Sequence, residues 1–352
     1  MPDLGRPSIS VLLPCRDAAE FLPECIASLE SQSHSDFEVL AVDDGSRDDT
    51  ASLLASWAQR DPRVLVLPGH SAGIVQALNL AAEHARAPLL ARMDADDAAY
   101  PERLSRQAEC LQNHPELAAC GTGVEFFSGA AGPRAAAERD AGTPMGSGTL
   151  RYQSWINSID SPDSVRRDLY VECPIAHPTL MIRRSVLAGL GGYRDRGWPE
   201  DYDLVLRLHA GGMSAANVPA VLHRWRVHPG RLSQRSPAYD AASFRSCKIH
   251  FLRSEALPPG RPVVVWGAGK VGKPFARELQ RQGTTVAAFV DLDARKLGQS
   301  IHRATVLSPD QFASIDRPFT LGAVGSPGAR DEIRQALTRL GHTECTDFLM
   351  VA

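Results

Sequence analysis

Three carboxylates stand within four positions of one another, at Asp94, Asp96 and Asp97. They follow the apolar run 88–90, which is typical of the end of a buried strand, and they precede Pro101, a residue that favours the first position of a helix. Like charges this close raise one another's pKa unless a cation lies between them. The residues are therefore either a solvated acidic turn or a site where a cation intervenes.

Polar residues also follow the other strands expected in this part of the chain. Apolar segments at 8–14, 37–42, 64–67 and 89–93 alternate with segments of helical spacing, which predicts a doubly wound α/β sheet. Ligands of such sheets bind beyond the carboxyl ends of the strands. The residues at those four ends are Arg16 and Asp17, Asp43 and Asp44, His70, and the acidic group at 94–97.

Composition narrows the class of protein. The chain has 352 residues, of which 43% are hydrophobic and 22% charged, and this mixture is typical of a globular chain with room for two domains. A formal net charge of -3 gives no electrostatic argument for nucleic acid or an anionic membrane as the main partner.

Seven dispersed cysteines, without a zinc-type spacing, indicate reduced thiols. With no signal-peptide or membrane-spanning pattern, we expect a cytoplasmic protein; peripheral membrane attachment and oligomeric state stay open.

The middle of the chain is less regular. Residues 128–150 are rich in Gly, Ala, Pro and Ser and predict a loop or an insertion. Residues 198–203 are expected to open a helix that ends at the glycines 211–212; the carboxylates at its start could simply be caps favoured by the helix dipole. Residues 221–228 alternate like a strand and are basic at their end.

The pattern of alternating elements restarts after a boundary near residue 254. We expect domains at 1–250 and 260–352, joined by a linker at 251–259. The strand 263–266 is followed by a GxGxxG turn at Gly267, Gly269 and Gly272, which opens a helix, and Asp291 stands about 20 positions further on. In this context the motif predicts a small Rossmann-like domain.

The order of the motifs resembles that of the family 2 glycosyltransferases of GT-A fold over roughly residues 8–240. The matching pieces are Ser-Val-Leu-Leu-Pro at 10–14, Val-Asp-Asp-Gly-Ser at 42–46, Asp-Ala-Asp-Asp at 94–97, His-Pro-Thr at 177–179, Glu-Asp-Tyr-Asp-Leu at 200–204 and the basic strand ending at Arg226 and His228. The resemblance implies an α/β fold with a GT-A type doubly wound mixed sheet, beside the second, smaller Rossmann-like α/β domain. It implies metal-dependent, inverting transfer of a sugar from a nucleotide sugar, with a UDP-sugar as the expected donor. The acceptor would be a hydroxyl of a carbohydrate or glycolipid in cell-surface polysaccharide or glycolipid synthesis.

The resemblance also assigns a nucleotide-sugar and metal site. Asp96 would bind Mg²⁺ or Mn²⁺, a hard cation that prefers oxygen ligands; Asp94 would touch ribose or metal, and Asp97 is a substitute ligand. His228 would reach the metal or the diphosphate, although a structural histidine is the equal alternative. The remaining residues implied on the donor side are Pro14, Arg16, Asp17, Asp43, Asp44, His70, Gly73, Arg92, Glu200 and Arg226.

For three of these residues we can name the contact that is expected with the nucleotide sugar. Asp44 could accept a hydrogen bond from the ring N–H of uracil, or it could serve only as a turn residue. Arg226 could pair with phosphate or be a surface arginine. Many members of the family have Ala-Arg-Asn where this chain has Ala-Leu-Asn at 77–79, so a phosphate contact would be missing, and Arg92 is the substitute that we expect.

The resemblance places a Glu-Asp pair beside the acceptor. Asp201 is accordingly the expected catalytic base, because a carboxylate can take the proton of an acceptor hydroxyl as the new C–O bond forms. Trp198 and Tyr202 offer flat faces on which a sugar could stack. His177 would line the acceptor side, with a buried structural histidine as the alternative.

The C-terminal domain resembles small nucleotide-sugar or dinucleotide-binding domains of the Gly-Ala-Gly type. The resemblance implies a nucleotide, nucleotide-sugar or NAD-like ligand, with the diphosphate near the glycines and Asp291 on a ribose hydroxyl. No Tyr/Lys pair or second substrate domain follows, which argues against a redox role. A regulatory ligand, a docking surface and a decayed site all stay open.

Two rival functions remain for the whole chain. A nucleotidyltransferase on a related fold would carry a glycine-rich phosphate loop after its first strand, where this chain has Pro-Cys-Arg-Asp at 14–17. A non-catalytic nucleotide-sugar sensor would bind the donor without turning it over. The residues do not identify the sugar, the acceptor or the linkage.

Overall fold

The computed structural model describes residues 6–129 and 146–352, so most of the loop expected at 128–150 lies outside the described residues. The chain divides into two compact units. The first consists of Met1–Val165, Ile175–Arg196 and Asp203–Ser236, and the second of Arg166–Pro174, Gly197–Tyr202 and Pro237–Ala352.

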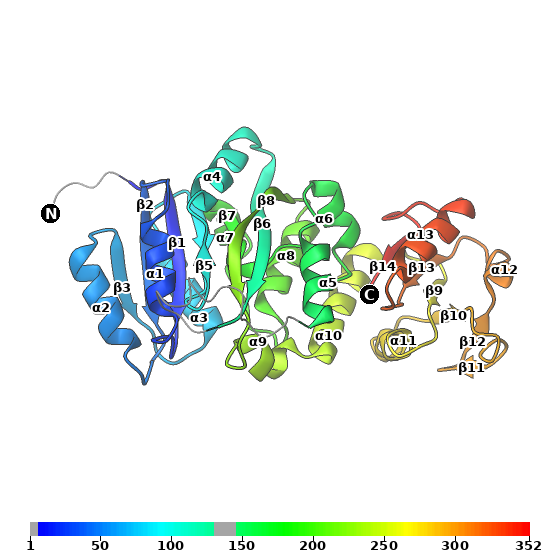
Figure 1. The fold of residues 1–352 in the computed structure, drawn as a ribbon. Helices are drawn as coiled ribbons and strands as arrows, with labels where there is room; N and C mark the ends of the chain where they lie inside the picture. Colours follow the sequence, from blue (N-terminus) through cyan, green and yellow to red (C-terminus); the bar gives the residue numbers. More distant parts are fainter. Residues whose placement is uncertain (1–5, 130–145) are drawn as a thin grey trace. The chain divides into compact units, whose positions relative to one another are not determined.

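An eight-stranded mixed sheet forms the first unit, in the strand order β3-β2-β1-β4-β7-β6-β8-β5 (Figure 1). Strands β1 to β4 run parallel to one another, whereas β7 is antiparallel to β4 and β6. The inner strands are apolar because both faces of such a sheet are covered. This confirms the mixed α/β fold. The strands are β1 (Ile9–Cys15), β2 (Phe37–Asp43), β3 (Val64–Pro68), β4 (Leu89–Arg92), β5 (Ala98–Ala99), β6 (Leu117–Phe127), β7 (Met181–Arg183) and β8 (Ser214–Arg226).

Helices connect and cover these strands. Helix α3 packs against β1 and β2, and α4 packs against β6 and β8. Helix α3 follows Gly73, whose φ of +91° is the left-handed conformation that glycine adopts without strain. The helices are α1 (Leu22–Glu30), α2 (Thr50–Arg60), α3 (Ile74–His84), α4 (Arg103–Asn113), α5 (Ser147–Ile156), α6 (Pro162–Asp168), α7 (Arg184–Gly189), α8 (Glu200–Ala210) and α9 (Leu232–Arg235).

The register of the sheet determines which residues meet at its edge. Cys15 pairs with Asp43 and Asp43 with Pro68, so the residues that follow β1, β2 and β3 leave the sheet side by side. Strand β5 begins directly after the acidic group at 94–97 and pairs antiparallel with β8, with Ala98 opposite Arg224. The end of β8 is therefore brought to the acidic turn.

The second unit contains a six-stranded sheet in the order β11-β12-β10-β9-β13-β14. It is parallel except for β11. The strands are β9 (Val263–Trp266), β10 (Val286–Val290), β11 (Ser300–Ile301), β12 (Ala304–Leu307), β13 (Phe319–Gly322) and β14 (Phe348–Met350), and the helices are α10 (Ala241–Phe251), α11 (Gly272–Arg281), α12 (Pro309–Phe312) and α13 (Ala329–Arg339).

The residues expected to form a linker begin as a helix. Phe251 is the last residue of α10, and Leu252–Ala256 continues as a π-helical turn. Helix α10 packs against α11 and belongs to the second unit, which begins at Pro237 in this region. The functional domain boundaries stay a prediction. Among the described helices, none is both long and apolar enough to cross a lipid bilayer.

Candidate functional site

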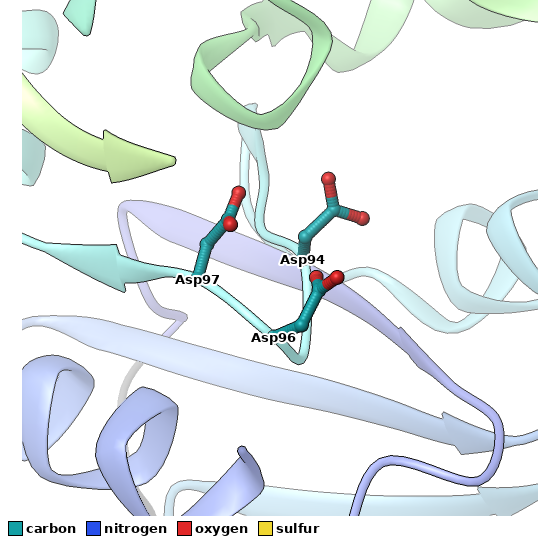
Figure 2. Close-up of side chains that lie close together, drawn as sticks. All are labelled: Asp94, Asp96 and Asp97. Carbon is teal, nitrogen blue, oxygen red and sulfur yellow. The ribbon is translucent and has the colours of Figure 1, made fainter. Parts of the chain in front are cut away.

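The three carboxylates of Asp94, Asp96 and Asp97 come together in the turn between β4 and β5, which we call the acidic turn. One oxygen from each lies within 4.8 Å of the other two. Figure 2 shows the three side chains rising from the turn to the same side. Asp97 is buried, whereas Asp94 and Asp96 are half-buried. Oxygen ligands in this number and spacing fit a hard divalent cation such as Mg²⁺ or Mn²⁺.

Arg92 orients the first of these carboxylates. Its guanidinium is buried, and Nη2 donates to Oδ1 of Asp94 at 2.5 Å. Arg92 therefore orients the carboxylate of Asp94. Its expected contact with a phosphate of the donor stays a prediction. Leu78, which occupies the position of the family's arginine, is fully buried in the core.

His228 lies on the second carboxylate. Its Nε2 is 2.8 Å from Oδ2 of Asp96, and its ring packs on Phe21 with centroids 4.6 Å apart. Burial works against ionisation of Asp96, but the hydrogen bond from His228 and the nearby positive charges of Arg231 and His228 outweigh it and hold the pKa of Asp96 below its usual value. The two residues expected to reach the metal thus lie in direct contact, although ligation itself stays a prediction.

Asp97 joins the acidic turn to β8. Its Oδ1 accepts from the backbone N–H of Arg226 at 2.7 Å, and its Oδ2 lies 2.8 Å from Nε2 of His223. Nδ1 of His223 lies 3.2 Å from Nη1 of Arg103. Because a guanidinium can only donate, Nδ1 must accept, so Nε2 carries the proton and donates to Asp97. Burial, followed by the charges of the other two carboxylates, raises the pKa of Asp97 well above its usual value.

The contacts of Arg226 differ from both alternatives that the sequence left open, a phosphate partner and a surface arginine. Its side chain is buried; Nε donates to the carbonyl of Asp96 at 2.7 Å, Nη1 donates to the carbonyl of Gly129 at 2.6 Å, and Nη2 pairs with Glu24. A guanidinium enclosed by protein acceptors in this way positions the acidic turn and is not presented to a ligand.

Arg103 is a component of the site that we did not identify from the sequence. It is buried on α4, and it donates to the carbonyl of Arg92 and, at 3.1 Å, to Oε1 of Gln107. Burial lowers its pKa to about 10, so it keeps its charge near neutral pH. A signal was present, because Arg103 and Gln107 lie four residues apart on the same helical face as the buried Leu104 and Leu111.

A second group of expected donor-side residues meets beyond β1 and β2. The carboxylate of Asp44 accepts from the backbone N–H groups of Ala72 and Gly73, at 2.9 Å each, and Nη1 of Arg16 lies 3.6 Å away. Asp44 is buried, whereas the side chain of Arg16 is 49% exposed. Asp44 therefore fixes the loop before α3, and its contact with a nucleobase stays a prediction.

The other expected residues of this edge stabilise its turns. Asp43 accepts from the N–H of Ser46 at 3.1 Å, and Asp17 accepts from the N–H of Arg47 at 2.7 Å. Pro14 lies in β1, and His70 follows directly after Gly69, whose N–H donates to the carbonyl of Asp43. These contacts bring the residues to one edge of the sheet without testing their roles toward a ligand.

His177 is buried in the first unit. Its Nε2 lies 3.3 Å from the hydroxyl of Tyr193, and burial, followed by the charge of Arg92, lowers its pKa well below the usual value. Asn79 fixes the same region, because its side chain donates to the carbonyl of Tyr193 and accepts from its N–H. His177 is thus a neutral buried residue; its place beside an acceptor stays a prediction.

The expected catalytic base and its neighbours belong to the second unit. Oδ1 of Asp201 accepts from the N–H of Tyr202 at 2.7 Å, and Oε2 of Glu200 accepts from the hydroxyl of Tyr239 at 2.5 Å. Trp198 is half-buried, with its ring 5.4 Å from that of His250. These contacts neither support nor exclude the predicted roles of Glu200, Asp201 and Trp198.

Tyr202 requires a correction. Its side chain is fully buried, and its hydroxyl donates to the carbonyl of Leu169 at 2.7 Å. A ring without an exposed face cannot stack on a sugar, so we withdraw that expectation. Tyr202 instead anchors the start of α8 to the segment that contains Leu169.

In the second unit, the GxGxxG residues lie where the sequence predicted them, in a turn between a strand and a helix. Gly267 follows the strand, Gly272 is the first residue of α11, and Asp291 follows β10. Oδ2 of Asp291 accepts from the N–H of Ala268 at 2.8 Å and lies 2.9 Å from Nζ of Lys296.

Comparison with known proteins gives one family and several relatives. The model of the family described as "Glycosyl transferase family 2" matches residues 10–190. The chain is 27% identical over 229 residues to the amylovoran biosynthesis glycosyltransferase AmsE of Erwinia amylovora. The matched region covers 65% of this chain and 79% of AmsE.

Two solved structures share the fold. TarS residues 1–349 of S. aureus, in complex with UDP-GlcNAc, has a TM-score of 0.52 at 16% identity and covers 71% of this chain and 68% of that one. The mannosyltransferase PcManGT from Pyrobaculum calidifontis, in complex with GDP-Man and Mn²⁺, has a TM-score of 0.50 at 19% identity and covers 80% of this chain and 71% of that one. At these identities the likeness shows the fold.

Proposed function

The chain belongs to glycosyltransferase family 2, and from this premise we propose that it transfers a sugar from a UDP-sugar to a hydroxyl of a carbohydrate or glycolipid acceptor, with inversion at the anomeric carbon. The observation that carries the proposal is the convergence of three carboxylates within 4.8 Å at the carboxyl end of β4, with His228 in contact with one of them. AmsE is named for a biosynthetic glycosyltransferase, which supports a role in building a glycan.

The donor set of the acidic turn fits a divalent cation. We propose that Asp96 and Asp94 hold Mg²⁺ or Mn²⁺, with Asp97 as a substitute ligand and His228 at the edge of the site. Such an ion supplies positive charge that stabilises the leaving nucleoside diphosphate. The Mn²⁺ named beside GDP-Man in the mannosyltransferase structure supports this assignment.

The chain's own residues would orient the nucleoside. Both oxygens of Asp44 already accept backbone N–H groups, and a carboxylate has about four lone-pair sites. Asp44 can therefore accept a further hydrogen bond, such as that from the ring N–H of uracil. The exposed guanidinium of Arg16 lies beside it and can contact a ribose or a phosphate.

We propose Asp201 as the catalytic base. An acceptor hydroxyl is a poor nucleophile near neutral pH, and a carboxylate within hydrogen-bond reach can take its proton as the C–O bond forms. The hydroxyl oxygen attacks the anomeric carbon on the side opposite the diphosphate, and the bond to the diphosphate oxygen breaks. Attack from the opposite side inverts the configuration. Trp198 remains the proposed stacking face for the acceptor sugar.

We also propose that the enzyme works in the cytoplasm, at the membrane surface where a glycolipid is its acceptor. All seven cysteines are free thiols, although several are buried. Free thiols in this number fit a reducing compartment.

The test is a measurement of UDP release by the full-length protein with a panel of UDP-sugars, Mn²⁺ and candidate acceptors. We expect Asp201→Asn to abolish acceptor-dependent turnover while the donor still binds in calorimetry. Asp163→Asn, which changes an exposed aspartate in α6, is the matched control and should keep full activity. Donor binding without turnover in the wild type would favour a sensor, and release of pyrophosphate from a nucleoside triphosphate and a sugar phosphate would favour a nucleotidyltransferase.

A further inference from the structure

A cavity of about 830 Å³ opens in the second unit at the carboxyl ends of β9, β10 and β13. From β9 the chain passes to β10 and β12 on one side, and it then returns to β13 on the other side of β9. The cavity therefore lies where the strand order reverses, which is where open α/β sheets bind ligands. Its volume is within the range of about 300–1,000 Å³ that is usual for small-molecule sites.

Packing within the unit explains two of the three glycines of the turn after β9. Gly267 has a φ of +120°, and a Cβ there would lie 2.8 Å from the carbonyl oxygen of Ala323. A Cβ at Gly272 would lie 1.7 Å from the carbonyl oxygen of Gly267. Both positions exclude any larger residue for reasons of fold alone.

Packing does not explain Gly269. Its φ is not in the left-handed range, and a Cβ there would meet no atom within 4 Å. Gly269 itself lines the cavity. A glycine that the fold does not need, facing an open cavity beside the start of α11, leaves room for close approach of a ligand to the backbone.

The charges of the cavity indicate an anionic ligand. Among its described lining residues, the cations Lys270, Lys296 and Arg339 outnumber the acids Asp291 and Glu332. Lys270 belongs to the glycine turn itself, so its charge adds to that of the backbone N–H groups at the helix start. Phosphate oxygens are therefore favoured at this end of the cavity.

A neighbouring part of the lining suits a nucleoside. Asp291 uses Oδ2 for Ala268 and Lys296, and Oδ1 for the N–H of Asp293 at 2.9 Å. Of about four lone-pair sites on a carboxylate, one on Oδ1 remains for a ribose hydroxyl. The next residue, Leu292, lines the cavity with 73% of its surface exposed, and it offers an apolar contact for a base.

We propose that this cavity binds a nucleotide whose diphosphate lies against Gly269 and Lys270, whose ribose meets Asp291 and whose base packs on Leu292. This site is additional to the donor site of the first unit, and it requires no chemistry at the nucleotide. It makes the second unit a ligand-binding module of the enzyme.

The test is calorimetry on the full-length Asp96→Asn chain in EDTA, which weakens metal-dependent binding at the donor site. The probes are ADP, UDP and NAD⁺, and we expect at least one to bind. Gly269→Ala in the same background should weaken that binding by about tenfold or more, which corresponds to about 1.4 kcal/mol, because its methyl group occupies the diphosphate space. Its melting temperature should not change, since the methyl group meets nothing within 4 Å.

The matched control is Gly189→Ala in the first unit, where a Cβ likewise meets no atom within 4 Å; it should bind the probe as the parent does. Leu292→Ser, at an exposed position, should weaken binding without unfolding the chain. The proposal is overturned if none of the three probes binds, or if Gly269→Ala binds as tightly as the parent. Sugar transfer measured with Gly269→Ala in the otherwise wild-type chain separates the two sites, because intact transfer with lost probe binding leaves the donor site unaffected.

Discussion

Nε2 of His228 lies 2.8 Å from Oδ2 of Asp96, although 132 positions separate the two residues in the sequence. The contact joins the residues after β8 to the acidic turn, and it contributes to the lowered pKa of Asp96. The central carboxylate of the turn is therefore ionised throughout the pH range in which a metal ion would be tested.

Removal of this carboxylate should abolish metal-dependent transfer. We expect Asp96→Asn to lower turnover at saturating Mn²⁺ by about 100-fold or more, by analogy with the loss of one oxyanion-hole donor, which typically costs about 2.7–4 kcal/mol. The measurement is a Mn²⁺ titration of UDP release. Asp310→Asn, which removes an exposed carboxylate in α12, should leave the titration unchanged. Normal turnover by Asp96→Asn would contradict the proposed metal site.

The pKa of Asp97 leads us to predict that stabilisation of the fold by Mn²⁺ varies with pH. Its pKa is raised above the reference value of 3.8 by burial and then by the neighbouring carboxylates. The folded chain then binds more protons than the unfolded chain above that value, so this group's contribution to stability falls as pH rises. A cation at the turn would hold Asp97 ionised and remove the penalty.

The gain in melting temperature on adding Mn²⁺ should accordingly be larger at about pH 7.5 than at about pH 5, by a few degrees for each kcal/mol recovered. Differential scanning fluorimetry measures it. In Asp97→Asn, which carries no titratable group at this position, the difference between the two pH values should shrink. An equal gain at both pH values in the wild type would show that Asp97 does not respond to the cation.

We expect Arg103 to contribute strongly to the free energy of unfolding, although it is a charged residue. Arg103→Met keeps the length of the side chain but leaves the carbonyl of Arg92 and Nδ1 of His223 without their donor, and we expect a loss of about 3–5 kcal/mol in the free energy of unfolding. Arg106→Met changes an exposed arginine of the same helix and should cost less than about 0.5 kcal/mol. Similar losses in chemical denaturation of the two variants would rule out this role.

Asp44 should act mainly on donor affinity. Asp44→Ala removes the acceptor of two backbone N–H groups in the loop before α3 and the proposed contact with the nucleobase. We expect the KM for the UDP-sugar to rise by about tenfold or more with a smaller change in kcat, which is the pattern of lost uniform binding. Asp49→Ala, at an aspartate whose side chain makes no helix-cap hydrogen bond, should keep the wild-type KM. A variant that loses kcat alone would place Asp44 in the chemical step instead.

The sequence was sufficient where the evidence was local. Apolar runs identified β1 to β4, and parallel order alone brings their carboxyl ends, and hence Asp44 and the acidic turn, to one edge. The glycine turn after β9 was equally accessible, because Gly267 and Gly272 have local backbone or packing roles. These features depend on neighbours a few positions away or on a general rule of α/β sheets.

The sequence was insufficient where a role depends on pairing between distant segments. The sequence left Arg226 as either a phosphate partner or a surface arginine, and both alternatives assumed an accessible side chain, yet Arg226 is buried in β8, the strand that pairs with β5. The same pairing places His223 between Arg103 and Asp97. The periodicity of apolar residues shows which face of a helix or strand is buried. It does not show which arginine side chain will be buried when a distant strand pairs with it.

The bond from the N–H of Arg226 to Asp97 spans 129 positions. Contacts of such separation carry the entropy cost of closing a long loop, so we expect this one to form late in folding. Strands β1 to β4 can assemble on a nascent chain while the acidic turn still lacks its partners from β8. If the turn holds a cation as proposed, we expect this ability to appear only near the end of folding and to report completion of the first unit rather than its early collapse.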